Sequence, residues 1–109
     1  MRAYEVMIII NAEVDEAGAK GVVAKATELI QSEKGRVATV DDWGRRRFAT
    51  PIDRRFEGTY VVVQVVTEAT NLNTLDRQLR LADETLRHKI IRLPDREATK
   101  RGLLGAVAG

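Results

Sequence analysis

Two spacings of hydrophobic residues recur along the chain, and they predict an alternation of strands and helices. Residues 3–10 (AYEVMIII) are apolar at nearly every position, which favours a short strand buried on both faces. Residues 16–34 carry an apolar stripe at helical spacing. Asp15 precedes this stripe as a candidate N-cap, and Lys34-Gly35 is typical of a helix end. The chain therefore begins with a strand followed by a helix.

An interrupted strand pattern follows the first helix. Residues 36–40 alternate between apolar and polar positions, and residues 45–50 resume the extended pattern. Between them, Trp43-Gly44 predicts a bulge, because a glycine inside a strand usually marks one. Pro51 cannot donate a backbone hydrogen bond, so it places this strand at an edge of the sheet.

The second half of the chain predicts a strand, a helix and a final strand. Residues 53–58 (DRRFEG) are expected to form a hairpin connection, and residues 59–67 (TYVVVQVVT) form a strand rich in β-branched residues. A helix of about three turns is expected after the candidate N-cap Thr70-Asn71. Its apolar stripe consists of Leu72, Leu75, Leu79 and Ala82. Residues 85–93 (TLRHKIIRL) predict the last strand, which Pro94 ends.

The predicted order is β-α-β-β-α-β with short connections, which indicates an α+β fold of the ferredoxin-like, split βαβ type. In this fold two helices cover one face of a four-stranded antiparallel sheet. Right-handed crossovers place the first and third strands in its middle. Residues 1–93 are expected to form this domain. Residues 94–109 have no clear period and are expected to form an extended C-terminal tail.

The sheet face that the helices leave uncovered is expected to remain largely apolar, because both faces of the first and third strands are apolar. An apolar patch of this kind marks a contact site on a small protein. Arg87, Lys89 and Ile91 share one face of the last strand and would border the patch. The candidate interface residues are Met7, Ile9, Tyr60, Val62, Gln64 and Val66. The patch is either a homodimer seam or a docking site for another chain or a nucleic acid, and the nearby arginines favour the second.

The distribution of charge is more informative than its total. The chain has 109 residues, no cysteine and a formal net charge of +2, and 13 of its 18 basic residues are arginines. Arginine carries a planar guanidinium suited to phosphates and to stacking on bases. Residues 44–55 hold five arginines against Asp53 alone. The apolar runs are far shorter than the about 20 residues that span a bilayer, so we expect a cytoplasmic protein.

Residues suited to catalysis or metal binding are scarce. His88 is the single histidine and is expected to be a packed or half-exposed side chain. Asp41 and Asp42 are adjacent in a strand and point to opposite faces, so they do not readily share a metal ion. The loop after the first strand (NAEVDEAGAK) lacks the glycine-rich sequence and the arginine that an acylphosphatase, an enzyme with this fold, would need. We therefore expect a protein that is not an enzyme and uses no cofactor or metal.

One block of sequence is specific enough to suggest a family. Residues 42–52 (DWGRRRFATPI) occur together with residues 2–5 (RAYE), 57–60 (EGTY) and 86–92 (LRHKIIR). In these blocks the chain resembles the bacterial small-subunit ribosomal protein six family, and the resemblance covers residues 1–93 in order. Thr50 departs from the family pattern, because an aromatic residue often stands before the proline.

The resemblance implies a structural component of the small ribosomal subunit that contributes to subunit assembly and translation. It also implies a heterodimer with the small basic ribosomal protein eighteen, and this heterodimer binds the central domain of small-subunit ribosomal RNA. The candidate interface residues would then face the partner protein. The candidate RNA-binding residues are Arg2, Arg45, Arg46, Arg87, Lys89 and Arg92.

Three alternatives remain at this point. An alternative role for the arginines at positions 45–47 is only to protect an edge strand from aggregation, since charges on an edge have that effect. Trp43 is expected to be a packing anchor at the bulge rather than a platform for a base. The whole chain could also be a metabolite-binding regulatory module that forms a homodimer through its sheet.

Overall fold

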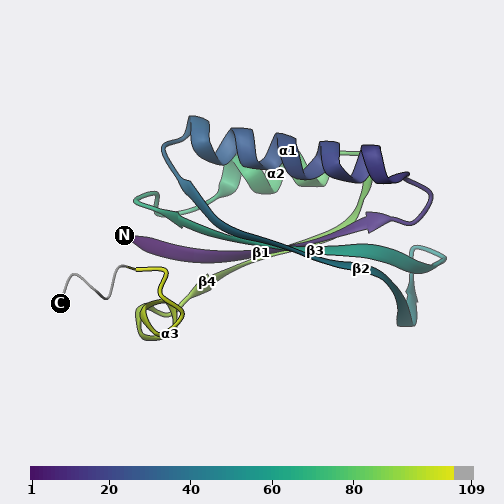
Figure 1. The fold of residues 1–109 in the computed structure, drawn as a ribbon. Coiled ribbons are helices and arrows are strands. Elements are labelled where there is room, and N and C mark those ends of the chain that lie inside the picture. The colour runs from purple at the N-terminus through teal and green to yellow at the C-terminus, as the bar shows by residue number, and fades with distance from the viewer. Residues whose placement is uncertain (105–109) are drawn as a thin grey trace.

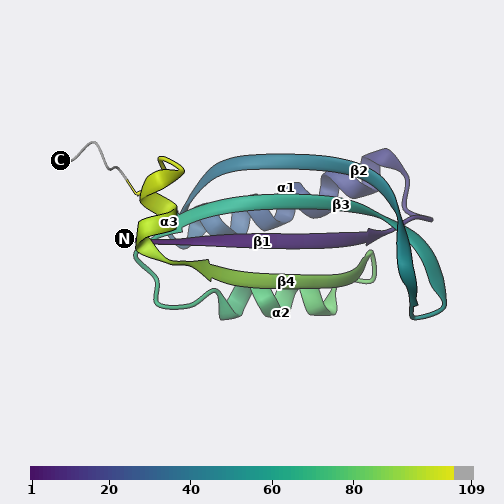
Figure 2. The same cartoon turned by 90° about the horizontal axis from the view of Figure 1, so that it is seen from below.

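A computed structural model of the chain describes residues 1–104 and contains a four-stranded antiparallel sheet with three helices (Figure 1). The elements are β1 (Arg2–Asn11), α1 (Glu16–Ser32), β2 (Arg36–Ile52), β3 (Arg55–Thr67), α2 (Asn73–Leu81), β4 (Thr85–Leu93) and α3 (Asp95–Lys100). The sheet order is β2-β3-β1-β4, with β1 and β3 in the middle (Figure 2). The predicted ferredoxin-like order and the central positions of the first and third strands are confirmed. Among the described residues, none of the helices has the length and hydrophobicity needed to cross a membrane.

Helix α1 begins and ends at the signals that its sequence carries. Asp15 is the N-cap, and its Oδ1 accepts a hydrogen bond of 2.8 Å from the backbone N–H of Gly18. At the other end Lys34 has a φ of 65°, and the backbone N–H of Gly35 donates to the carbonyl of Ile30 at 2.8 Å. The helix ends two residues before the predicted limit of residue 34 because this left-handed residue reverses the chain.

The main core lies between the sheet and the pair formed by α1 and α2, which cover the same face (Figure 1). Strand β1 contributes Tyr4, Val6, Ile8 and Ile10, and strand β3 contributes Val61, Val63 and Val65. The helices contribute Val22, Ala26, Ile30, Leu75 and Leu79. Alternation along the strands therefore turns the other set of β1 and β3 side chains toward the opposite face, which we call the open face.

The C-terminal segment is not extended where the structure describes it, and the prediction of an extended tail is wrong for residues 95–100. These residues form α3, which lies on the side of the sheet opposite α1 and α2, near the start of β1 (Figure 1). Pro94 is suited to the start of this helix, and Gly102, with a φ of 75°, follows its end. Ala98 and Leu103 are buried against Ala3, Val66 and Leu93 in a second small core. Residues 105–109 of the predicted tail lie outside the described residues.

The paired strands β2 and β3 extend further than predicted, so the turn between them is shorter. Only Asp53 and Arg54 form the turn, with φ values of 47° and 66°, whereas residues 53–58 were expected to do so. Positive φ at both central residues is the geometry of two-residue hairpin turns, because it matches the twist of the flanking strands. β2 is an edge strand, as Pro51 predicted. The bulge near Gly44 is also confirmed, because the β2–β3 register shifts between Asp42 and Gly44.

Candidate nucleic-acid and protein interface

Four cross-strand rows of side chains make up the open face. Strand pairing aligns one residue from each strand, in the order β4, β1, β3, β2. Starting from the end near α3, the rows are Leu93–Ala3–Val66–Arg36, Ile91–Glu5–Gln64–Thr39, Lys89–Met7–Val62–Asp41 and Arg87–Ile9–Tyr60–Gly44. Residues opposite one another in antiparallel strands share a face and lie about 5 Å apart. All six candidate interface residues therefore belong to the open face.

These six residues differ in accessibility, so the expectation of an uncovered apolar patch is corrected. Val66 is 1% exposed because α3 and Leu103 cover it. Ile9 and Val62 are also buried. The half-buried members are Met7, Tyr60 and Gln64, and the exposed Ile91 of β4 lies beside them. The accessible part of the open face is thus a narrow strip across the three rows that α3 does not cover.

Two of the predicted RNA-binding residues border this strip. Arg87 and Lys89 lie on the open face of the edge strand β4, and both are exposed. Neither forms an ion pair with another residue in the range 1–104. Arg87 occupies the same cross-strand row as Tyr60. Positive charge therefore lies directly beside the half-buried residues of the strip.

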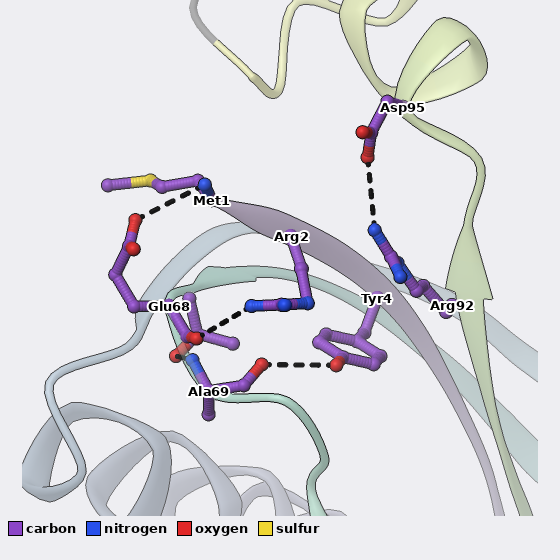
Figure 3. Close-up of polar contacts among 8 residues, drawn as sticks. Met1, Arg2, Tyr4, Glu68, Ala69, Arg92 and Asp95 are labelled. Carbon is purple, nitrogen blue, oxygen red and sulfur yellow. Dashed lines mark hydrogen bonds and ion pairs between the residues drawn. The ribbon is translucent and has the colours of Figure 1, made fainter.

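Arg2 and Arg92 lie elsewhere, at the end of the sheet near α3 (Figure 3). Alternation places both on the face opposite Arg87 and Lys89, since Tyr4 pairs with Arg92. Arg2 Nη1 donates to the carbonyl oxygen of Glu68 at 2.9 Å, and the N-terminal amine lies 3.2 Å from Glu68 Oε1. Arg92 Nη2 lies 3.3 Å from Asp95 Oδ1. These two arginines are partly engaged by their own chain.

The bulge at Gly44 separates the arginines of β2. Arg46 pairs with Gly58 and lies on the open face, where its Nε donates to the carbonyl of Trp43 at 3.2 Å. Arg45 pairs with Thr59 and lies on the helix side. There its Nη2 donates to the carbonyl of Ala12 at 3.0 Å, and its Nη1 is 3.3 Å from Glu57 Oε1. The structure therefore does not bring the six predicted RNA-binding residues into one patch.

Trp43 has a position that the sequence did not predict. It is 46% exposed, although it was expected to be a packing anchor. Its indole ring is parallel to the ring of Tyr60, with an interplanar angle of 3° and a centroid distance of 6.3 Å. Phe48 packs on Tyr60 in turn, with ring centroids 6.0 Å apart. The only sequence signal for this arrangement was Gly44, because the bulge determines which residues of β2 face Tyr60.

The single histidine has a structural partner. His88 Nε2 lies 2.7 Å from Asp76 Oδ1 of α2, and its side chain is largely buried. This hydrogen bond lowers the pKa of Asp76 below its ordinary value of 3.8. Within residues 1–104, no three acidic or histidine side chains are grouped so that they could hold a metal ion. The hydrogen-bonded pair of Asp76 and His88 thus serves to join α2 to β4.

Comparisons with known proteins agree with the fold and with the sequence blocks described above. The sequence profile of the family described as ribosomal protein S6 matches residues 3–92. The small ribosomal subunit protein bS6 of Corynebacterium glutamicum is 44% identical over 93 residues, which are 85% of this chain and 98% of that protein. The protein of the same name from Carboxydothermus hydrogenoformans is 39% identical over 92 residues, which are 84% of this chain and 96% of that protein.

A solved structure gives the same answer. The crystal structure of 30S ribosomal protein S6 from Thermotoga maritima superimposes with a TM-score of 0.84 at 31% sequence identity. The match covers 93% of this chain and 95% of that one. The chain therefore belongs to the ribosomal protein S6 family and is a structural, non-enzymatic component of the small ribosomal subunit.

Proposed function

We propose that this protein binds the central domain of small-subunit ribosomal RNA as a heterodimer with ribosomal protein eighteen. The open face docks the partner protein, and the arginines and lysine around it contact RNA. The observation that carries this proposal is the accessible strip of Met7, Tyr60 and Gln64, which lies beside exposed basic residues of β4.

The protein side of the proposal rests on the character of the strip. Half-buried and exposed apolar side chains gather on the three rows beyond α3, and such patches on small proteins mark contact sites. Helix α3 covers the row that contains Val66, and in the other three rows Met7, Tyr60, Gln64 and Ile91 remain accessible. Tyr60, Met7 and Ile91 are the side chains that a partner would bury most. Val62 and Ile9 lie buried beside them on the same face.

The RNA side rests on charge. The chain has a formal net charge of only +2, so it is a weak ligand for a polyanion by itself. A small basic partner would supply further neutralisation of phosphates. Arg87 and Lys89 are exposed and unpaired among the described residues, which makes them the foremost candidates for phosphate contacts. Arg2 and Arg92 form a second group, and Arg45 is the weakest candidate because Ala12 and Glu57 already hold its guanidinium.

A binding experiment with the full chain tests the RNA contacts. A fragment of central-domain RNA is titrated with the protein alone and with the heterodimer, across a series of salt concentrations. We expect tight binding only when the partner is present. Arg87→Ala should reduce the slope of log affinity against log salt by about one unit, the effect of one lost phosphate contact. Arg77→Ala removes an exposed arginine from α2, on the helix side, and should leave the slope unchanged.

A second pair of variants tests the protein contact. Ile91→Asp places a charge on the exposed part of the open face and should abolish heterodimer formation. Leu81→Asp makes the same kind of change on α2 and should not. Equal RNA affinity with and without the partner would overturn the proposal. So would a homodimer of the isolated chain, seen by gel filtration, that dissociates on Ile91→Asp.

A further inference from the structure

Trp43 and Arg46 lie together on the open face although they are three residues apart in an edge strand. In a regular strand, positions separated by an odd number point to opposite faces. The bulge between Asp42 and Gly44 inserts one residue without a partner and reverses the alternation that follows. Trp43, Arg46 and Tyr60 consequently line one open hollow of about 440 Å³.

The indole ring of Trp43 is held in a fixed orientation. Its Nε1 donates to Asp41 Oδ2 at 3.0 Å, and one side of the ring packs on Tyr60. Tyr60 is itself supported by Phe48. Nearly half of the Trp43 surface nevertheless stays exposed. A rigid, exposed aromatic ring can receive a further planar group without first losing conformational freedom.

The charges around this ring favour an anion. Arg46 uses only its Nε for the carbonyl of Trp43, and among the described residues it has no ion-pair partner. Arg47 and Arg54, further along the same hairpin, also lack ion pairs within residues 1–104. The carboxylates of Asp41 and Asp42 accept hydrogen bonds from the indole of Trp43 and from the backbone N–H of Gly44, and both keep their negative charge. An anion would therefore bind on the side of Arg46, whose Nη groups form no hydrogen bond with the described residues.

We infer that Trp43 and Arg46 form a stacking site for an unpaired nucleotide of RNA. The base would stack on the indole, and the guanidinium of Arg46 would bind the adjacent phosphate. The combination of an aromatic face and an arginine recognises single-stranded nucleic acid, whose bases are free to leave the helical stack. This inference rests on the proposed function and adds to it a defined contact with an unpaired base. It also assigns the β2 edge of the open face to RNA and the β1 and β4 side of the same face to protein.

Intrinsic fluorescence tests the site without any substitution, because Trp43 is the only tryptophan of the chain. The full-length protein is titrated with a short oligoadenylate at low ionic strength. Stacking of adenine on the indole should quench the tryptophan emission in a saturable manner. A duplex RNA of equal charge is the matched control, and it should quench much less because its bases are not available. No quenching by oligoadenylate would overturn the inference.

Variants separate stacking from charge, with affinities measured by the anisotropy of labelled oligoadenylate. Trp43→Ala should weaken binding at least about fivefold, the lower end of the effect of one base–aromatic stack, without changing the salt dependence. Trp43→Phe should recover part of that loss. Arg46→Ala should reduce the salt slope by about 0.7, as expected for one phosphate of a single strand. Arg47→Ala removes the same charge from the helix side of β2 and should have a smaller effect.

The outcomes distinguish this site from the proposed function as a whole. If Trp43→Ala binds oligoadenylate as tightly as the unaltered chain, the stacking site is wrong, even when the heterodimer still binds central-domain RNA. If the partner protein alone quenches Trp43 and oligoadenylate does not, the ring faces protein and the inference falls. If oligoadenylate quenches Trp43 but the heterodimer does not bind central-domain RNA, the stacking site stands and the proposed function fails.

Discussion

Arg101 Nη1 lies 3.0 Å from Glu5 Oε2, so an ion pair connects the residue after α3 with the middle of β1. The Nε of the same guanidinium lies 2.9 Å from Glu97 Oε1, and the two carboxylates raise the pKa of Arg101. All three side chains are partly exposed, and ion pairs in such positions contribute little to stability. The burial of Ala98 and Leu103 must therefore hold α3 and the residues after it against the sheet, while the ion pairs fix the direction of this segment.

Leu103→Ala is expected to loosen the C-terminal segment more than Arg101→Ala does. The leucine is buried over Ala3 and Val66, so its truncation should cost up to about 2 kcal/mol, the low end for buried leucines. Hydrogen exchange measures this locally, because the backbone N–H of Leu103 donates to the carbonyl of Ala98. Faster exchange in α3 together with unchanged exchange in β3 is the expected pattern. Unchanged exchange in α3 would contradict it.

Two leucines of α2 provide a matched test of the main core. Leu79 is 1% exposed and Leu81 is 69% exposed. Leu79→Ala should lower the free energy of unfolding by about 2–5 kcal/mol, through lost burial and a residual cavity. Leu81→Ala should change it by less than about 0.5 kcal/mol. Urea denaturation followed by circular dichroism measures both values, and similar losses would mean that α2 presents a different face to the sheet.

Gly44 and Gly21 are expected to respond to alanine in opposite directions. A Cβ at either position would meet no atom within 4 Å, so backbone conformation alone decides the outcome. Gly44 has a φ of 77°, where alanine costs about 1–2 kcal/mol. Gly21 lies inside α1, where alanine should stabilise by about 0.5–1 kcal/mol. Thermal unfolding compares the two variants, and Gly44→Ala should also alter the emission of Trp43.

Asp76→Asn is expected to reduce stability in a pH-dependent way. Folding lowers the pKa of Asp76 through its hydrogen bond with His88, so the stabilising effect is fully present above the ordinary pKa of 3.8. It is lost as the pH falls through the lower pKa of the folded state. The deficit of Asp76→Asn relative to the unaltered chain should therefore shrink below about pH 3.8.

Denaturant melts at several pH values measure this deficit. Asp83→Asn is the control, because Asp83 is exposed and has no ion pair among the described residues. A deficit of Asp76→Asn that stays constant from neutral to acid pH would mean that the pair with His88 does not stabilise the fold through ionisation.

The sequence predicted the layers of this fold because its strands and helices have distinct periods. The β-branched run of residues 59–67 and the apolar stripe of α1 could be placed without knowledge of their neighbours. Helix α3 could not, because it is six residues long and buries only Ala98. Too few of its positions are buried for a helical period of apolar residues to appear in the sequence. The segment is instead held by its contacts with Val66 and Leu93 of the sheet.

The site was predicted less completely for a related reason. The sequence indicated the basic and apolar residues of the site and the open face that carries most of them. The face on which each β2 arginine lies, however, depends on the register at one bulge. The hairpin end was missed because Asp53 and Arg54 adopt positive φ, which the sequence does not indicate for an arginine. Gly58 instead suggested a turn. It is a buried strand residue, where a Cβ would approach Ile9 and Phe48 to within 3.0 Å or less.

The sheet order β2-β3-β1-β4 also constrains how the chain can be made. The first strand to leave the site of synthesis lies between the two that are translated last, since β1 pairs with β3 and β4. Strand β1 therefore has no partner until residues 55–67 have emerged, and its edge toward β4 stays unpaired until residue 93 has emerged. Completion of the sheet is consequently a late event, and during elongation the apolar strand β1 is the segment of this chain most in need of protection from aggregation.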